Sequence, residues 1–229
     1  MNNLKIIGTS HIAKQSIEEI KKAVEEYQPD IIAVELDAQR AAALLHQQKT
    51  KISFADIAKI GVHGYVFVKI GQYIQQKLGK MVGVAPGSEM KTALELAQKN
   101  KIKVAFIDQP IQITLVNFSK ELTWREKGRF FLDMIMGLLF PKKQMKKYGL
   151  EKFDLRRVPE QEVIAKIINE MKKQYPSVYK TLITDRNRYM VKLLVKLLHE
   201  HPEKKILAIV GAGHKEGMGK LLLKVDVVR

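Results

Sequence analysis

The sequence contains no cysteine, and this absence excludes several kinds of chemistry. Disulfide frameworks, thiol nucleophiles and thiolate metal sites all require cysteine side chains. Histidine, aspartate and glutamate remain as the strong metal ligands that the chain offers, so any metal site must use nitrogen and oxygen donors.

The sequence also lacks a long apolar segment. Its most apolar stretch, FFLDMIMGLLF (130–140), is interrupted by Asp133 and is much shorter than the roughly 20 residues that span a bilayer. The first residues do not show a charged segment followed by a long apolar one, as a secretory signal would. We therefore expect no signal peptide and no transmembrane helix, and a location in the cytoplasm or at the periphery of a membrane.

Acidic residues are outnumbered, since 24 Asp and Glu stand against 40 Lys and Arg, a formal net charge of +16. Such a charge attracts nucleic acids and anionic membranes. Most basic residues are scattered along helical segments, and the one dense run, PKKQMKKYG (141–149), is not interleaved with aromatic residues. We expect no specific nucleic-acid binding. The basic run, next to the apolar MIMGLLF, suits either an anionic lipid surface or an ordinary solvated loop.

Four short apolar runs predict β-strands, and helical patterns separate them. The runs are LKIIGT (4–9), DIIAVELD (30–37), KIKVAFID (101–108) and KKILAIVGAG (204–213). After the first run, Ser16 and Glu19 predict a helix start with a capping box. Such alternation of strand and helix predicts βα units with parallel strands. We expect an α/β fold, with a parallel-rich central sheet flanked by helices, in a single domain over residues 1–229.

Two mainly helical insertions are expected in this domain, at about 50–82 and 119–203. In the second, TWRE (123–126) predicts a capping box formed by Thr123 and Glu126. Pro141 interrupts the helical pattern that follows.

Polar side chains stand at the carboxyl end of every predicted strand. They are His11, Glu35 with Asp37, Asp108 and His214. Because ligands of open parallel sheets bind outside the carboxyl ends of the strands, these side chains should converge on one rim. Two imidazoles and several carboxylates on one rim suit a metal site with nitrogen and oxygen ligands or an acid–base site. Both histidines follow the pattern GxxH, in GTSH (8–11) and GAGH (211–214).

Several of these polar residues admit more than one interpretation. Glu35 lies in an apolar run, where a lone carboxylate is costly, so we favour a position in a cleft over one beyond the strand end. Asp37 fits best as the N-cap of the next helix. Arg40 is in range of Asp37, as a surface pair or as an anion clamp. Glu89 occupies the first turn of a later helix, which is a routine place for an acid.

One arginine lies on a helix face that should be buried. This face is formed by Leu182, Arg186, Tyr189 or Met190, Leu193 and Leu197. A buried arginine is usually paired with a carboxylate or directed at an anionic ligand. We interpret Asp185 and Asn187 beside it as solvated residues or as contacts between helices.

With these residues in view, the sequence resembles the TraB/PrgY family, known for pheromone-shutdown proteins of conjugative plasmids. It is similar, more remotely, to Tiki metalloproteases, ChaN-like proteins and erythromycin esterases, which share paired GxxH motifs. The resemblance covers nearly the whole chain, through GTSHIAKQSIEEI, PDIIAVELDAQR, KLGKMVGVAPGSEM, IDQPIQITL, TDRNRYM and VGAGHKEGM. The chain departs from the family at Gln109, Asp185 and Asn187, where Arg, Glu and Asp are usual.

The resemblance implies a set of site residues and a cofactor. The residues at motif positions are His11, Glu35, Arg40, Glu89, Asp108, Arg186 and His214. Through Tiki, the resemblance implies a peptidase that depends on a divalent metal, with Mn²⁺ or Co²⁺ as the expected ion.

Roles for these residues follow from the implied chemistry. His11 and His214 would bind the ion, and Glu35 would be a third ligand or the general base. Arg40 and Arg186 would hold a substrate carboxylate or stabilise the developing oxyanion. The remaining acids, Glu89, Asp108 and Asp37, would be secondary ligands or would orient the histidines.

The resulting expectation is a metal-dependent hydrolase that cleaves a peptide, such as a signalling pheromone. The alternative is a non-catalytic protein that binds a peptide or a partner at a membrane surface with the same cleft. Expected partners are a peptide substrate or ligand, an anionic membrane surface and a second copy of the chain.

Overall fold

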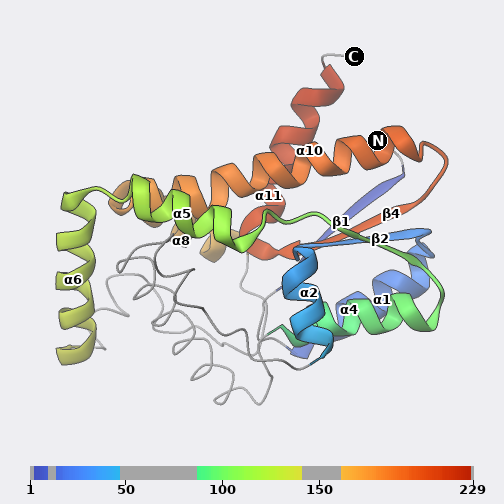
Figure 1. Cartoon of the computed structure of the whole chain (residues 1–229), viewed down its shortest axis with the longest axis horizontal. Helices are drawn as coiled ribbons and strands as arrows, with labels where there is room; N and C mark the ends of the chain where they lie inside the picture. Colours follow the sequence, from blue (N-terminus) through green and yellow to red (C-terminus); the bar gives the residue numbers. More distant parts are fainter. Residues whose placement is uncertain (1–2, 10–13, 47–86, 141–160, 228–229) are drawn as a thin grey trace.

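The computed structural model describes residues 3–9, 14–46, 87–140 and 161–227, and a four-stranded sheet lies at its centre (Figure 1). The strands are β1 (Leu4–Thr9), β2 (Ile31–Val34), β3 (Lys103–Phe106) and β4 (Ile206–Gly211). Every strand pair is parallel, and the spatial order is β1-β4-β2-β3. The predicted α/β class with a parallel sheet is therefore confirmed.

The sheet is buried on both faces because its inner strands are apolar. In β2, Ile31 and Ala33 belong to the core on one face, and Ile32 and Val34 to the core on the other. This division follows from the alternation of side chains along a strand. β4 is buried along its whole length.

Helices cover both faces of the sheet and make three layers (Figure 1). α1 (Lys14–Tyr27) and α4 (Ser88–Lys99) pack on the face that includes Ile32 and Val34. α10 (Asp185–Glu200) and α11 (Ala212–Val227) pack on the opposite face. The chain runs across the sheet from β1 to β2 to β3 and then returns to β4, which lies between β1 and β2. The carboxyl ends of β4, β2 and β3 therefore lie side by side near the point where the direction reverses, and α/β proteins bind ligands at such a point.

Five further helices and a π-helical turn complete the part of the chain that the structure describes. They are α2 (Ala38–Leu45), α5 (Ile111–Glu121), α6 (Trp124–Leu139), α8 (Gln161–Gln174), α9 (Pro176–Tyr179) and the π-helical turn η1 (Lys180–Thr184). α6 stands at the end away from the sheet and runs across the direction of α10 (Figure 1). The insertion predicted at about 50–82 lies outside the described residues. Among the described helices, none is both long and apolar enough to cross a bilayer.

Helix starts test three of the sequence predictions. Asp37 is the N-cap of α2, as predicted, and its Oδ1 accepts a hydrogen bond from the backbone N of Arg40 at 2.9 Å. The capping box of Thr123 and Glu126 is confirmed at the start of α6. The predicted box at Ser16 is wrong, because Ser16 is buried inside α1 rather than placed before it.

Candidate functional site

The carboxyl ends of three strands deliver predicted site residues to one place. Glu35 directly follows β2, Asp108 comes shortly after β3, and His214 lies in the first turn of α11, which begins directly after β4. All three side chains are buried. The fourth predicted rim residue, His11, lies outside the described residues.

Arg186, in the first turn of α10, joins these residues. Its Nε and Nη2 atoms donate to Oδ1 and Oδ2 of Asp108 at 3.0 and 2.8 Å, which makes a bidentate pair. Nη2 also donates to Oε1 of Glu35, and Nη1 lies 3.1 Å from Nε2 of His214. We refer to Arg186, Glu35, Asp108 and His214 as the rim cluster.

The helix face predicted to carry Arg186 is shifted in the structure. The core residues of α10 are Met190, Val191, Leu194 and Leu198, whereas Leu193 and Leu197 are only partly buried. Arg186 therefore lies at the margin of the buried face, and its long side chain reaches from there to the rim. Its Nη1 also donates to the carbonyl oxygen of Leu182 in η1 at 3.3 Å. π turns recur at functional sites, and this one directly precedes α10.

Arg186 stays charged although its side chain is only 15% exposed. Burial by itself would lower the pKa of the guanidinium group. The carboxylates of Glu35 and Asp108 outweigh burial and raise the pKa of Arg186 above its ordinary value. Arg40 adds a second cation, because its Nη1 donates to Oδ2 of Asp108 at 2.8 Å. Two guanidinium groups thus face two carboxylates, so the positive and negative charges are equal in number. Buried charges need such partners to offset the loss of hydration.

Arg40 is the cation of this network that solvent reaches more easily. Its side chain is 34% exposed, more than twice the exposure of Arg186. The guanidinium group contacts Asp108, so the predicted side-chain pair with Asp37 is not formed. An anionic group of a ligand would therefore meet Arg40 first.

Glu35 lies just beyond the strand end, yet it is buried. Oε1 accepts from Arg186, and Oε2 accepts from the backbone N of Gly211 at 2.6 Å. Gly211 ends β4 immediately before α11, so Glu35 places negative charge at the start of a helix, where the helix dipole favours it. These donors explain how an apolar run can end in a carboxylate.

Both ring nitrogens of His214 have neighbours. Nδ1 lies 2.6 Å from Oδ1 of Asn187, and Nε2 lies 3.1 Å from Nη1 of Arg186. A guanidinium group can only donate, so the contact with Arg186 favours the tautomer in which Nε2 accepts and Nδ1 carries the proton toward Asn187. Nε2 also lies 3.4 Å from Oε1 of Glu35, which would accept a proton from the charged imidazolium. These contacts orient the ring and place Nε2 at the rim.

Of the two interpretations of Asn187, the contact between helices is the one that the structure has, since the side chain is buried and reaches from α10 to His214 on α11. Its contact with a site histidine was not predicted. Gly217 of α11 makes room for it, because a Cβ atom at that position would collide with the amide nitrogen of Asn187. A signal was present in the sequence: Asn187 precedes Met190 and Val191 at the three- and four-residue spacing of one helix face.

The other predicted site residues have contacts of their own. Gln109 supports Asp108, since its backbone N donates to Oδ1 of Asp108 at 2.8 Å and its side-chain amide donates to Thr114 at 3.0 Å. Glu89 is buried in the first turn of α4 and is not among the partners of Arg186. Asp37 serves the start of α2.

For a divalent ion, the described residues supply an incomplete set of ligands. Within the described ranges, no group of three or more His, Asp or Glu side chains is arranged to hold an ion. Glu35 and His214 lie together, but Arg186 donates to the first and lies within hydrogen-bond distance of the second. An ion would need Arg186 to leave and a further ligand, such as His11, from outside the described residues.

The fold and the rim cluster define a class of protein: a three-layered parallel α/β protein with buried acids, a histidine and arginines at the carboxyl ends of its strands. The sequence profile of the TraB/PrgY/gumN family matches residues 2–225. The chain belongs to this family, which confirms the resemblance seen in its motifs.

Relatives of known sequence extend beyond the region that this chain matches. An uncharacterized protein of Methanocaldococcus jannaschii is 33% identical over 226 residues, which cover 96% of this chain and 53% of that protein. The human TraB domain-containing protein is 24% identical, over 94% of this chain and 61% of the human one. The chain thus spans less than two thirds of the length of either relative. Among solved structures, an erythromycin esterase mutant in its open conformation is similar over 91% of this chain and 60% of that chain, with a TM-score of 0.36 and 14% identity.

Proposed function

We propose that the protein is a hydrolase that cleaves a peptide bond, with the rim cluster as its catalytic centre. The observation that carries this proposal is the placement of the His214 ring, with Nδ1 held by Asn187 and Nε2 at the rim beside Glu35. A general base needs a basic atom of this kind, held in place beside the reacting groups.

In the proposed reaction, Nη1 of Arg186 turns from Nε2 of His214 to the carbonyl oxygen of the bound peptide, which frees the lone pair of Nε2. Nε2 then takes a proton from water while the water oxygen attacks the carbonyl carbon of the peptide. The protonated imidazole then faces Oε1 of Glu35, which lies 3.4 Å away in the resting arrangement and stabilises the positive charge. The same proton passes to the amine when the C–N bond breaks, so His214 returns to its neutral form. Asn187 holds the ring through both steps.

Arg186 and Arg40 supply the positive charge that the tetrahedral intermediate needs. Nη1 of Arg186 lies beside Nε2 of His214, so it is close to the oxygen that becomes negative. Arg40, at the more exposed edge, binds a carboxylate of the peptide. Asp108 fixes both guanidinium groups and is a positioning residue.

A divalent ion is a separate part of the proposal. Mn²⁺ or Co²⁺ would be held by His214 and Glu35 together with His11, and it would supply Lewis-acid chemistry. Because the described residues alone do not complete such a site, the roles given above use only side chains of the chain itself.

The test is cleavage of a peptide library by the purified protein, followed by mass spectrometry, with chelator, with added Mn²⁺ and with added Co²⁺. His214→Ala and Arg186→Lys should each slow cleavage by about 10²-fold or more. His46→Ala changes an exposed histidine and is the matched control, expected to leave the rate unchanged. Activity that needs an ion and is lost in His11→Ala would assign the ion a role. No cleavage under any of these conditions would overturn the hydrolase.

A second function, non-catalytic binding of a peptide or partner, is supported by the way Arg186 is held. A guanidinium group fixed by two carboxylates, next to the more exposed Arg40, is a rigid recognition element that needs no turnover. Calorimetry distinguishes the two functions: binding that is lost in Arg40→Gln, with no product formed by the wild type, supports the binder.

A further inference from the structure

Helix α6 turns its polar side toward the rest of the protein. Three side chains of one stripe, Glu126, Arg129 and Asp133, hydrogen-bond to residues 174–177, which join α8 to α9. The three distances are 2.8, 3.0 and 2.5 Å. The spacing of three and four residues places these side chains on one face of the helix. A surface helix usually buries its apolar side instead, so the side chains of α6 that the structure describes show the reverse of this pattern.

The opposite face of α6 is apolar and exposed. Trp124, Leu132 and Leu139 lie on it and are 81%, 62% and 65% exposed. Gly128, between the first two, is exposed as well. At 1.5 Å per residue, this stripe runs for about 22 Å along the helix. We call this stripe the α6 face. An exposed apolar stripe of this kind marks a site of interaction with a protein or a membrane.

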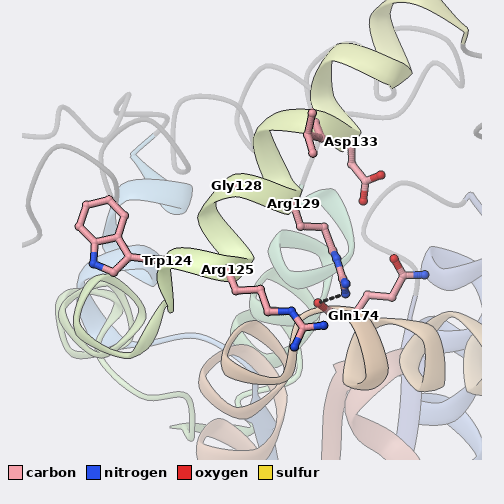
Figure 2. A pocket seen from close by; sticks show the side chains of 7 residues that line it. Trp124, Arg125, Gly128, Arg129, Asp133 and Gln174 are labelled. Atoms are coloured by element: carbon pink, nitrogen blue, oxygen red, sulfur yellow. Dashed lines mark hydrogen bonds between the residues drawn. The ribbon is translucent and has the colours of Figure 1, made fainter.

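The charged residues that border the α6 face are basic. Arg125 is exposed, and Nζ of Lys127 lies 4.4 Å from the centre of the Trp124 ring. The two acidic residues of α6 belong to the stripe that bonds to the body. Figure 2 shows Trp124 on one side of the helix and Arg129 and Asp133 on the other, with Arg129 bonded to Gln174.

We propose that the α6 face docks on an anionic lipid bilayer. A helix with Trp and Leu on one face and Lys and Arg at its borders lies in the interfacial plane of a membrane, and Trp favours the headgroup level. The formal net charge of +16 attracts anionic lipid and opposes a second copy of the same chain. A groove of about 660 Å³ beside the face is lined by Arg125, Arg129 and Asp133 (Figure 2). Asp133 accepts a hydrogen bond from Tyr175, and the two arginines outnumber it, which suits phosphate headgroups.

Intrinsic fluorescence tests this proposal directly, because Trp124 is the only tryptophan of the sequence. The full chain is titrated with vesicles of phosphatidylcholine, with and without phosphatidylserine. With the anionic vesicles, emission should shift to the blue and should be quenched by brominated lipid. Neutral vesicles should produce neither effect. An unchanged spectrum with anionic vesicles would overturn the proposal.

Matched variants locate the contact. Leu139→Ser removes an apolar side chain from the α6 face, whereas Leu223→Ser removes one that is equally exposed, at 67%, on α11. Vesicle affinity should fall about tenfold or more in the first variant and stay unchanged in the second. Arg125→Gln should weaken binding about fivefold, while Lys192→Gln on α10 should have no such effect. Equal losses in the two leucine variants would rule out α6 as the contact.

Other occupants of the face have their own signatures, and each would overturn the proposal. A blue shift that grows with protein concentration and without lipid would indicate a second copy. A shift produced by polyglutamate, in competition with vesicles, would indicate an acidic protein partner. His214→Ala should bind vesicles like the wild type, so failure of the membrane proposal is distinguishable from failure of the hydrolase.

Discussion

Asp108→Asn removes the one buried carboxylate that holds both guanidinium groups. Its oxygens accept two hydrogen bonds from Arg186 and one from Arg40. Asparagine keeps the size and shape of the side chain, but it loses the negative charge and replaces one acceptor by an amide that donates. Arg186 is then left with Glu35 as its carboxylate partner, and Arg40 loses the partner described for its guanidinium group.

The expected loss of stability follows from the burial of the partners. Breaking a fully buried pair by removing one member costs about 3–5 kcal/mol. Arg186 keeps Glu35, and Arg40 is partly exposed and screened by solvent, so the loss should be smaller. We expect the free energy of unfolding to fall by about 2–3 kcal/mol, which lowers Tm by roughly 4–12 °C for a chain of this size.

Urea unfolding followed by far-ultraviolet circular dichroism measures this change. Near-ultraviolet circular dichroism provides a second probe, and coincident transitions justify a two-state treatment. Glu26→Gln is the control, because Glu26 pairs with Lys22 at 3.7 Å on the exposed side of α1 and should contribute little.

A free energy of unfolding for Asp108→Asn within about 0.5 kcal/mol of the wild type would refute the reasoning, since changes of that size are ordinary for surface positions. An increase in stability would refute it as well, because it would mean that the buried network destabilises the fold. A double-mutant cycle with Arg40→Gln separates the contributions of the two arginines.

Three further predictions concern other contacts. Gly217→Ala should displace Asn187 and lower kcat of peptide cleavage about tenfold or more with little change in KM, whereas Gly219→Ala, where no atom lies within 4 Å of the new Cβ, should change neither. Asn187→Leu should lower kcat in the same way, because the Nδ1 proton of His214 loses its acceptor. Burial alone would raise the pKa of the Glu126 carboxyl, but hydrogen bonds from Ser177 and Thr123 outweigh it and lower the pKa. The wild type should therefore have a higher free energy of unfolding than Glu126→Gln. This difference should be complete above about pH 5 and should disappear as pH falls below about 4, as measured by unfolding at each pH.

The strands and the fold class could be predicted because they depend on local pattern. The run at Ile31–Val34 is apolar at every position, which indicates a strand covered on both faces, and the structure has it so. The spatial order of the strands could not be predicted, because β4 pairs with β1 and β2 across more than 170 residues. That pairing depends on the packing of two separate cores and not on any local signal.

The rim residues could be predicted from their positions at the ends of apolar strands, but the side chains that they contact could not. Strand ends indicated Glu35 and Asp108, whereas the pairing of Arg40 with Asp108 joins residues from α2 and from the end of β3. Sequence spacing placed Asp37 nearest to Arg40, but the N-cap of α2 already uses the Asp37 carboxylate. Spacing identifies which residues share a face of one element, and it says little about the side chain that a long arginine will meet on another.

The rim cluster couples the stability of the fold to the chemistry of the site. Glu35 binds Gly211 at the end of β4 and Arg186 on α10, so one carboxylate joins three elements. Asp108 joins Arg186 to Arg40 on α2. Substitutions of these acids should therefore lower stability and activity together. Asn187→Leu removes one hydrogen bond of His214, so it should lower activity more than stability. This contrast separates the groups that hold the layers from the group that orients the base.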